Sequence, residues 1–238
     1  LTLDLADNDS ILDLAGAPLG GPGAGNGDVA GPAYFVDHSA PTVAMEVVSP
    51  TVRRSPVTQL RLTFSETVIG LNAADVALTK DGAAVAGVSV VAVYATEYAL
   101  TLPDAGDGAY EVSLVAVGSG IADAVGNALA NDVRASWTLD ETAPTATLAA
   151  VTPALRNTAV PEVKLTFSEA VAGLDGADVV LTKNGAAVAG MTVAAASATD
   201  YTVTLPDAGE GAYELSVVAA GSGIADAAGN VLATDAKV

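Results

Sequence analysis

The sequence repeats itself with a period of 103 residues, and this period constrains the fold more than any other feature. The segment Ala40–Thr42 recurs as Ala143–Thr145, and Leu62–Glu66 recurs unchanged as Leu165–Glu169. Further matches at the same offset pair Thr101–Gly106 with Thr204–Gly209, and Ser119–Asp123 with Ser222–Asp226. A fixed offset without gaps indicates one folding unit that is used twice.

The period divides the chain into three parts. Residues 38–140 hold one complete unit, and residues 141–238 hold a second unit that stops at Val238, before the counterpart of the last strand, Ser136–Asp140. Residues 1–37 end in Tyr34–Asp37, which parallels Trp137–Asp140. We therefore expect residues 1–37 to be the C-terminal strands of a preceding repeat, and the sequence to be part of a longer repetitive protein.

Within each unit, apolar and polar residues alternate with the period of two that is typical of half-buried strands, as in Leu60, Leu62 and Phe64. Asp81-Gly82 and Asn184-Gly185 stand between apolar runs, which favours two-residue hairpins, because both turn residues need a positive φ. About seven short strands in about 100 residues is the strand count of an immunoglobulin-like (Ig-like) sandwich with Greek-key connections. The sequence therefore predicts an all-β fold of tandem Ig-like β-sandwiches.

Two tyrosines stand where an Ig-like sandwich has its tyrosine corner. Tyr110 and Tyr213 each open a strand just after Gly-Asp-Gly-Ala or Gly-Glu-Gly-Ala. In a tyrosine corner the hydroxyl bonds back to the backbone a few residues upstream. The alternative is that both are ordinary core residues.

Charge and composition limit the partners of the chain. Nine Lys and Arg against 28 Asp and Glu give a formal net charge of −19, so phosphate backbones would be repelled and no nucleic acid is expected. The absence of cysteine excludes disulfides, thiol catalysis and Cys-bound metal sites. Apolar runs fall short of the roughly 20 residues that cross a bilayer, so we expect no membrane insertion. No leader peptide is visible before the first repeat fragment.

Residues suited to catalysis are scarce. The chain has one histidine, His38, and it has no nucleophile elbow, no His-Glu-x-x-His motif and no phosphate loop. Aromatic residues make up 4% of the sequence, too few to build the sugar platforms of a glycosidase cleft. We expect the chain not to be an enzyme.

Many acidic residues fall in loops that an Ig-like topology brings to one end of the sandwich, where the chain enters and where the B–C and F–G loops lie. In the first unit these are Asp37, Glu66, Asp75, Asp123 and Asn127, and in the second Asp140, Glu141, Glu169, Asp178, Asp226 and Asn230. The E–F loop of the first unit, with Asp104 and Asp107, would face the second set across the junction.

Several carboxylates in one small volume repel each other, and a hard divalent cation with six to eight oxygen ligands relieves that repulsion. We therefore hypothesise Ca²⁺ at the junctions between units. On this hypothesis, neutralising Glu169 and Asp226 together would leave the ion-free protein no less stable. The alternative is that these are ordinary turn and cap residues, because Asp and Asn favour turns for backbone reasons.

Four motifs in a fixed order resemble a known family. The Ala-Pro-Thr start, Leu-Thr-Phe-Ser-Glu, Ala74-Asp75-Val76 before a strand and Gly120–Asn127 before the last strand resemble the tandem bacterial Ig-like repeats of large surface adhesins and related secreted proteins. The likeness covers nearly the whole chain. It implies stacked β-sandwiches outside a bacterial cell, often stiffened by calcium, that carry a separate adhesive tip.

We therefore expect an extracellular structural spacer, secreted or at the bacterial cell surface, whose partners are the neighbouring Ig-like repeats of the same chain. A host or matrix ligand would be bound through other domains. Two alternatives remain open. One is a ligand-binding module that contacts a glycan or a host protein, for which Tyr94 is the best candidate although its counterpart is Ser197. The other is an accessory module of a secreted enzyme.

Overall fold

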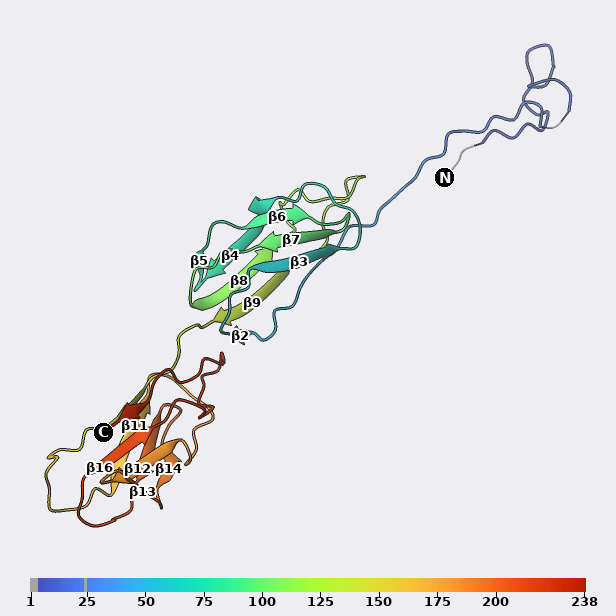
Figure 1. Ribbon diagram of the computed structural model, residues 1–238. Coiled ribbons are helices and arrows are strands. Elements are labelled where there is room, and N and C mark those ends of the chain that lie inside the picture. The colour runs from blue at the N-terminus through green and yellow to red at the C-terminus, as the bar shows by residue number, and fades with distance from the viewer. Residues whose placement is uncertain (1–3, 24) are drawn as a thin grey trace.

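A computed structural model describes residues 4–23 and 25–238 and shows two β-sandwiches that follow one another end to end (Figure 1). Strands of the first sandwich lie within residues 43–139, and those of the second within residues 146–237. In the described part of the chain, the one helical element is a short 3₁₀ turn, η1 (Ala73–Asp75). The prediction of an all-β fold is therefore confirmed. No helix among these residues is long and apolar enough to cross a membrane.

The first sandwich contains a four-stranded and a five-stranded sheet. The four-stranded sheet has the order β1 (Val43–Met45), β3 (Gln59–Phe64), β7 (Glu97–Thr101) and β6 (Ser89–Ala92). The five-stranded sheet has the order β2 (Val52–Arg53), β9 (Val133–Leu139), β8 (Gly108–Leu114), β4 (Val76–Lys80) and β5 (Ala83–Ala84). Neighbouring strands are antiparallel except β2 and β9, which run parallel.

The second sandwich contains two four-stranded sheets. One has the order β10 (Ala146–Leu148), β11 (Glu162–Phe167), β15 (Asp200–Thr204) and β14 (Thr192–Ala195). The other has the order β13 (Ala186–Val188), β12 (Val179–Lys183), β16 (Tyr213–Val217) and β17 (Ala236–Lys237). Each of these strands matches one in the first sandwich by position in its sheet.

Alternation along the strands builds a separate core in each sandwich. In β3, Leu60, Leu62 and Phe64 are buried while the residues between them are exposed. The buried face of β3 meets the other sheet, where Trp137 of β9 stacks on Tyr110 of β8 with ring centroids 5.2 Å apart. The period of two in the sequence therefore marks the residues that form the cores.

The hairpins and tyrosine corners have the predicted geometry. Asp81 and Asn184 both have φ of 51°, and each is followed by a glycine with positive φ, as a type I′ turn requires. The hydroxyl of Tyr110 donates to the carbonyl oxygen of Gly106 at 2.6 Å, and that of Tyr213 donates to Gly209 at 2.6 Å. Each corner fixes the loop that leads into β8 or β16.

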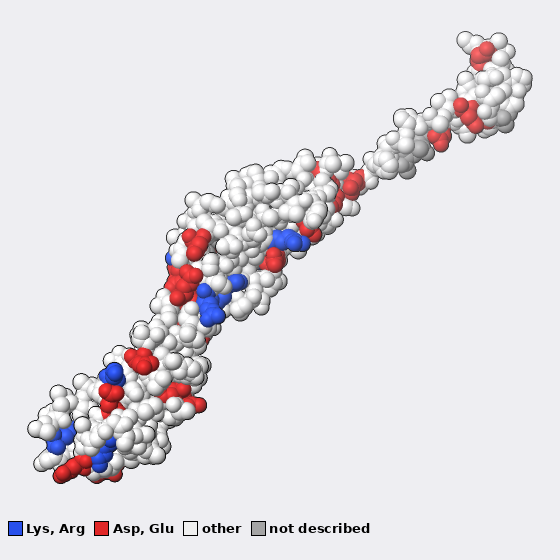
Figure 2. Space-filling view, viewed as in Figure 1, with Lys and Arg blue, Asp and Glu red and all other residues white. Residues whose placement is uncertain are grey.

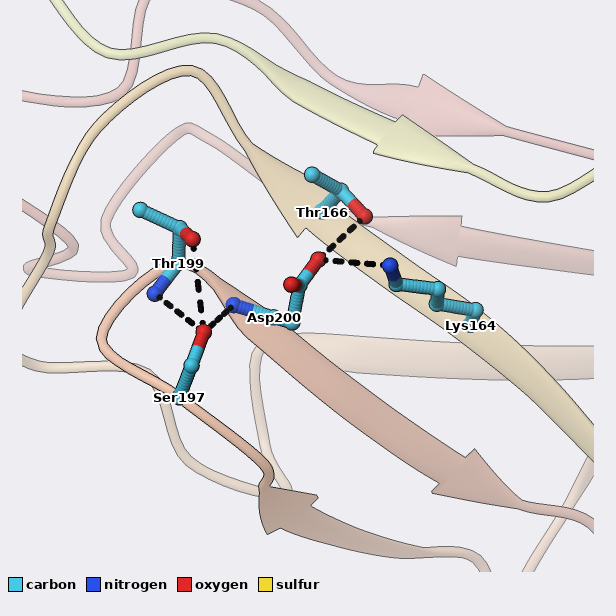
Figure 3. A network of polar contacts seen from close by, with 5 residues as sticks. All are labelled: Lys164, Thr166, Ser197, Thr199 and Asp200. Carbon is cyan, nitrogen blue, oxygen red and sulfur yellow. Dashed lines mark hydrogen bonds and ion pairs between the residues drawn. The ribbon is translucent and has the colours of Figure 1, made fainter.

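An ion pair on the exposed face of the four-stranded sheet recurs with different residues. In the second sandwich, Lys164 Nζ lies 2.9 Å from Asp200 Oδ1, which also accepts a bond from Thr166 (Figure 3). Ser197 accepts bonds from the backbone amides of Thr199 and Asp200 and so holds the turn before β15 (Figure 3). In the first sandwich the same place is taken by Arg61 and Glu97, 3.2 Å apart. An exposed pair of this kind contributes little to stability, roughly 0.2–1 kcal/mol.

The described residues before the first sandwich form loops and isolated bridges rather than strands. Leu5 is bridged to Val29, and Leu12 to Pro18. Residues 30–42 contain no strand and extend away from the first sandwich (Figure 1). The expected strands of a preceding repeat are therefore not formed as strands in the described residues of this segment.

The last strand is paired over different lengths in the two sandwiches, because the sequence stops at Val238, before the counterparts of Ser136–Asp140. In the first, β9 pairs with β8 along seven residues, from Leu139 opposite Gly108 to Val133 opposite Leu114. In the second, β17 pairs with β16 only at Ser216 and Val217. Tyr110 is consequently 4% exposed, whereas its counterpart Tyr213 is 41% exposed.

Candidate metal centres

Two groups of three carboxylates lie at corresponding places in the two sandwiches. Asp37, Glu66 and Asp123 form the first acidic cluster, and Asp140, Glu169 and Asp226 form the second. Within each cluster, one carboxylate oxygen from every residue lies within 4.8 Å of those of the other two. Acidic side chains gather near both ends of the first sandwich on the face seen in Figure 2, and some basic side chains lie beside them.

Each cluster joins three segments that are far apart in the sequence. Its first aspartate lies before the sandwich, its glutamate follows β3 or β11, and its second aspartate lies in the loop after β8 or β16. A short bridge holds the last two loops together, because Ile69 N donates to the carbonyl oxygen of Ala122 at 2.8 Å. Ala172 and Ala225 form the same bridge in the second sandwich. The backbone thus sets the distance between glutamate and aspartate.

The second aspartate of each cluster is a buried structural residue. Asp226 is 8% exposed, and its Oδ1 accepts backbone bonds from Ala228, Gly229 and Asn230 at 2.8–2.9 Å. Its Oδ2 accepts a bond from Asn230 Nδ2 at 2.8 Å, and the same amide nitrogen donates to the carbonyl oxygen of Asp140. Asp123 is 2% exposed and has the same set of bonds. These carboxylates hold the loop before the last strand in one conformation.

The hydrogen bonds lower the pKa of both buried aspartates. Burial alone would raise the pKa of Asp226, but the bonds donated by Asn230, Gly229 and Ala228 outweigh it, so the pKa lies below its ordinary value. The pKa of Asp123 is lowered in the same way, with Asn127 as the main donor. Both groups therefore remain ionised at neutral pH.

The pKa of the glutamate in each cluster is shifted in the opposite direction, above its ordinary value. Partial burial and the charges of Asp140, Asp226 and Asp107 raise the pKa of Glu169 above its ordinary value of 4.5. The pKa of Glu66 is raised by burial and by the charges of Asp123 and Asp37. Within each cluster, the repulsion between carboxylates therefore affects mainly the pKa of the glutamate.

The donor set of each cluster fits a calcium ion. Calcium takes six to eight oxygen ligands at about 2.3–2.6 Å, so oxygens within 4.8 Å of one another can share one ion. In the second cluster, Asp226 Oδ1 is saturated by three amides, but its Oδ2 keeps a lone pair beside the Asn230 bond. Asp140 uses Oδ1 to accept from Thr142 N, which leaves its Oδ2 available.

Hydrogen bonds from the first sandwich reach the linker beside the second cluster. Asp107 accepts from Glu141 N at 2.7 Å through Oδ1 and from Thr142 Oγ1 at 2.6 Å through Oδ2. These bonds lower the pKa of Asp107, and the bond from Thr142 has the largest effect. On another side, Arg54 Nη1 donates to the carbonyl oxygen of Gly229 at 3.0 Å. The joint between the sandwiches is thus held by two side chains of the first sandwich.

The remaining candidate residues lie outside the two clusters. Asn127 and Asn230 support Asp123 and Asp226 through amide bonds. Asp75 and Asp178 accept bonds from the backbone amides of Asn72 and Asp175 and so close local turns. Asp104 accepts from Gly106 N within its own loop. The backbone amide of Glu141 is used, but its exposed side chain is not part of the second cluster.

Arg54 and Thr142 were not among the residues indicated by the sequence. The partner of Arg54 is a backbone carbonyl in the other sandwich, and no sequence pattern marks such an acceptor. Thr142 stands in the linker next to Asp140, but its bond to Asp107 depends on the way the two sandwiches are placed. The one available signal is that the counterpart of Thr142 is Ser39, which also carries a hydroxyl.

Replacing Asp226 with alanine is expected to lower the free energy of unfolding of the second sandwich by on the order of 2–3 kcal/mol, because three backbone amides and one side-chain amide lose their acceptor. Urea unfolding followed by circular dichroism, in the presence of a chelator, measures the change. Asp207→Ala is the control, since exposed Asp207 accepts one local bond from Gly209. Equal losses in both variants would contradict a structural role for Asp226.

The calcium-free stability is expected to depend on Glu169 only above about pH 4.5. A raised folded-state pKa means that stability is fully present below the unfolded value of 4.5 and is lost as pH rises through the folded value. Glu169→Gln should therefore raise the melting temperature at neutral pH and leave it unchanged in acid. A pH series of melting temperatures with chelator tests this. A difference that is constant across the series would show that repulsion is not its cause.

The chain was compared with known protein families and solved structures. A family profile for the bacterial Ig-like domain matches residues 140–237. Among solved structures, native alpha-2-macroglobulin from Escherichia coli, spanning domains MG0-NIE-MG1, is 15% identical, with 72% of this chain and 65% of that chain covered and a TM-score of 0.27. The SGBP-B protein of a Bacteroides ovatus mixed-linkage glucan utilization locus, in complex with a mixed-linkage heptasaccharide, is 22% identical, with 80% and 43% covered and a TM-score of 0.23. The chain spans less than two thirds of either structure, and no curated protein matches the sequence.

Proposed function

We propose that the chain is a structural spacer of an extracellular bacterial protein, on the premise that residues 140–237 match the profile of the bacterial Ig-like domain. In this proposal calcium binds at each acidic cluster and stiffens the joint beside it, and the chain carries out no catalytic step. Adhesion would then be carried by other parts of the same protein. The observation that carries the proposal is the position of the second acidic cluster at the joint between two sandwiches.

The linker between the two sandwiches is short and hydrogen-bonded on both sides, which limits bending at this joint. Only six residues separate the end of β9 at Leu139 from the start of β10 at Ala146, and Pro144 among them restricts the backbone. Asp107 ties the start of this linker to the first sandwich, and Arg54 ties the Gly229 loop to it. A short linker held on two sides favours an extended arrangement of the sandwiches (Figure 1).

Calcium would strengthen this joint by joining the linker to the second sandwich. Asp140 belongs to the linker, whereas Glu169 and Asp226 belong to the sandwich. An ion that binds all three would couple these parts and remove the repulsion that raises the pKa of Glu169. The first cluster would act in the same way through Asp37, which precedes the first sandwich.

Calcium is expected to raise the melting temperature of the chain. A ligand that binds only the folded state stabilises it by RT ln(1 + [L]/Kd), which gives roughly 0.4–1.4 kcal/mol per site at about 1 mM Ca²⁺ for a Kd of about 10⁻⁴–10⁻³ M. For a unit of about 100 residues this corresponds to roughly 2–10 °C. Melting and small-angle scattering are compared in calcium and in EDTA, with a longer, narrower particle expected in calcium.

Two matched variants test whether the calcium response of the melting temperature arises at the second acidic cluster. Glu169→Gln should remove most of the calcium response of the second sandwich while leaving the buried Asp226 and its loop intact. Glu162→Gln is the control, because Glu162 lies at the other end of β11 from the cluster. If EDTA changes neither the melting temperature nor the scattering profile, the acidic clusters are ordinary loop residues and the calcium part of the proposal is wrong.

A further inference from the structure

We propose that two copies of this chain associate through the free edge of β6 in the first sandwich. The two β6 strands would run antiparallel about a two-fold axis, so that the four-stranded sheets of the two copies continue into one another. The resulting dimer is closed, because each copy uses the same edge once. The proposal goes beyond the spacer function and does not depend on calcium, since it rests on one strand of the first sandwich.

One side of the β6 backbone has no strand partner among the described residues. In the order β1-β3-β7-β6, this strand pairs with β7 alone. Val93 N donates to the carbonyl oxygen of Glu97 at 2.8 Å, and the backbone groups of successive residues in an antiparallel strand point alternately to its two sides. The backbone of Val91 therefore also faces β7. The N–H and C=O groups of Val90 and Ala92 face the free edge.

The outer face of this edge carries exposed apolar side chains. Val91 is 58% exposed, Val93 is 51% exposed, and Tyr94, which follows directly, is 70% exposed. The side chain of Val90 points the other way, since it packs against the core of the first sandwich. Edge strands are commonly protected from other strands by lysine, proline or a bulge. The sequence of β6 contains no charged residue and no proline, so its edge lacks this protection.

The corresponding edge of the second sandwich, β14, has smaller side chains. At the repeat offset, three large exposed residues in and after β6 are matched by small ones in and after β14: Val91 by Ala194, Val93 by Ala196 and Tyr94 by Ser197. The three small residues are exposed as well. Of these two equivalent edges, that of the first sandwich therefore offers the larger apolar surface, which favours a dimer over a longer assembly.

The charge of the chain favours a second copy as the occupant of this edge. The formal net charge of −19 would attract a basic partner, but residues 83–96 contain no charged residue to bind one. Two copies of so acidic a chain repel each other over most of their surface, so an uncharged edge is where they can approach most closely. The surface around β6 is largely free of charged side chains in the view of Figure 2.

One register satisfies both the backbone and the side chains. With Val91 opposite Val91 of the other copy, Val90 of each copy lies opposite Ala92 of the other. These two residues then form hydrogen-bonded pairs, since their N–H and C=O groups face the shared edge. The two Val91 side chains meet across a non-hydrogen-bonded pair, in which opposing Cα atoms are about 4.5 Å apart. Val93 of each copy lies opposite Ser89 of the other.

The test is the mass of the full 238-residue chain in solution as a function of its concentration. The strands are short, so the interface is small and we expect association in the micromolar to millimolar range. Sedimentation equilibrium in EDTA, at physiological ionic strength, should show an average mass that rises from 23.3 kDa towards twice that value and no further. Val91→Lys should abolish the rise, because it places two like charges opposite each other at the axis. Ala194→Lys is the matched control and should retain the rise, since it adds the same charge at the equivalent exposed position of β14.

A single cysteine tests the register, because the wild type has none. Val91→Cys brings two thiols together at the axis, within the reach of a disulfide. Oxidised glutathione should link copies of this variant at least about tenfold faster than copies of Ala194→Cys, because pairing raises the effective concentration of the thiols. Circular dichroism melting checks that all four variants are folded, and the cysteine variants carry the test if a lysine variant unfolds.

Three results would overturn the proposal. The first is a wild-type chain that stays at one copy throughout the concentration range. The second is association that Val91→Lys leaves unchanged or that Ala194→Lys abolishes equally, because either result would place the contact elsewhere. The third is an equal rate of disulfide formation in Val91→Cys and Ala194→Cys.

Discussion

Trp137→Ala is expected to lower the free energy of unfolding of the first sandwich by about 3–5 kcal/mol. The ring is 4% exposed, lies in the core of the first sandwich and stacks on Tyr110 with an interplanar angle of 3°. Its removal leaves a cavity in the core beside Tyr110 and exposes the tyrosine corner. Guanidinium unfolding followed by circular dichroism should show the transition of the first sandwich moved to lower denaturant, with that of the second unchanged.

A conservative variant separates packing from other effects. Trp137→Phe keeps an aromatic ring on Tyr110 and should lose distinctly less stability than Trp137→Ala. The wild type also offers an internal assignment, because Trp137 is the single tryptophan and its fluorescence reports only on the first sandwich. A loss below about 1 kcal/mol in the alanine variant would contradict the packing described here.

Gly173→Ala is expected to destabilise the second sandwich by about 2–5 kcal/mol, and Gly70→Ala the first by a similar amount. Both glycines have φ near +90°, and a Cβ at either would lie 2.4 Å from a backbone carbonyl oxygen, of Gly223 or Gly120. The clash would push apart the two loops that hold the glutamate and the buried aspartate of each acidic cluster. Thermal unfolding in EDTA measures the loss of stability.

The control for Gly173 is a glycine with similar backbone and open surroundings. Gly221 has φ of +79°, and a Cβ there would meet nothing within 4 Å. Gly221→Ala should therefore cost only the left-handed conformation, about 1–2 kcal/mol. If the two variants lose equal stability, the close approach of the loops at Gly173 does not matter. A calcium response that is weaker in Gly173→Ala than in Gly221→Ala would further connect this close approach to the proposed calcium site.

The fold could be predicted from the sequence because the patterns that indicate strands and turns are local and occur in both repeats. Alternation in Leu60, Leu62 and Phe64 fixes which face is buried, and Asp81-Gly82 fixes a turn, whatever lies elsewhere in the chain. The Ig-like sandwich follows from the number and spacing of these strands, and it is confirmed by the family match over residues 140–237. In the described residues before residue 38, the structure contains isolated bridges, such as that between Leu5 and Val29, and no strand of the expected preceding repeat.

Which carboxylates form the acidic clusters was harder to predict from the sequence than the fold. Topology alone indicates that the segments of Asp140, Glu169 and Asp226 meet, because it fixes which loops share an end of a sandwich. It does not indicate which carboxylate turns inward. Asp75 and Asp178 lie in the expected loops but are used by amides three residues earlier. Such local bonds compete with ligand binding and depend on φ and ψ that no spacing reveals.

The role of Asp226 illustrates the same limit. Charge counting treats it as one of several repelling carboxylates, from which we expected that neutralising it together with Glu169 would cost no stability. The four donors around Asp226 reverse this expectation for that residue, because they stabilise its ionised form. The expectation stays a prediction for Glu169, whose pKa is raised by its neighbours.

The parallel pairing of β2 with β9 has a mechanical consequence. β2 belongs to the beginning of the first sandwich and β9 to its end, with Val52 opposite Thr138 and Arg53 opposite Leu139. When the two ends of the sandwich are pulled apart along its axis, parallel strands slide past each other, so their hydrogen bonds are loaded together instead of opening one by one. Tension that reaches β2 is therefore shared across the hydrogen bonds of this pair.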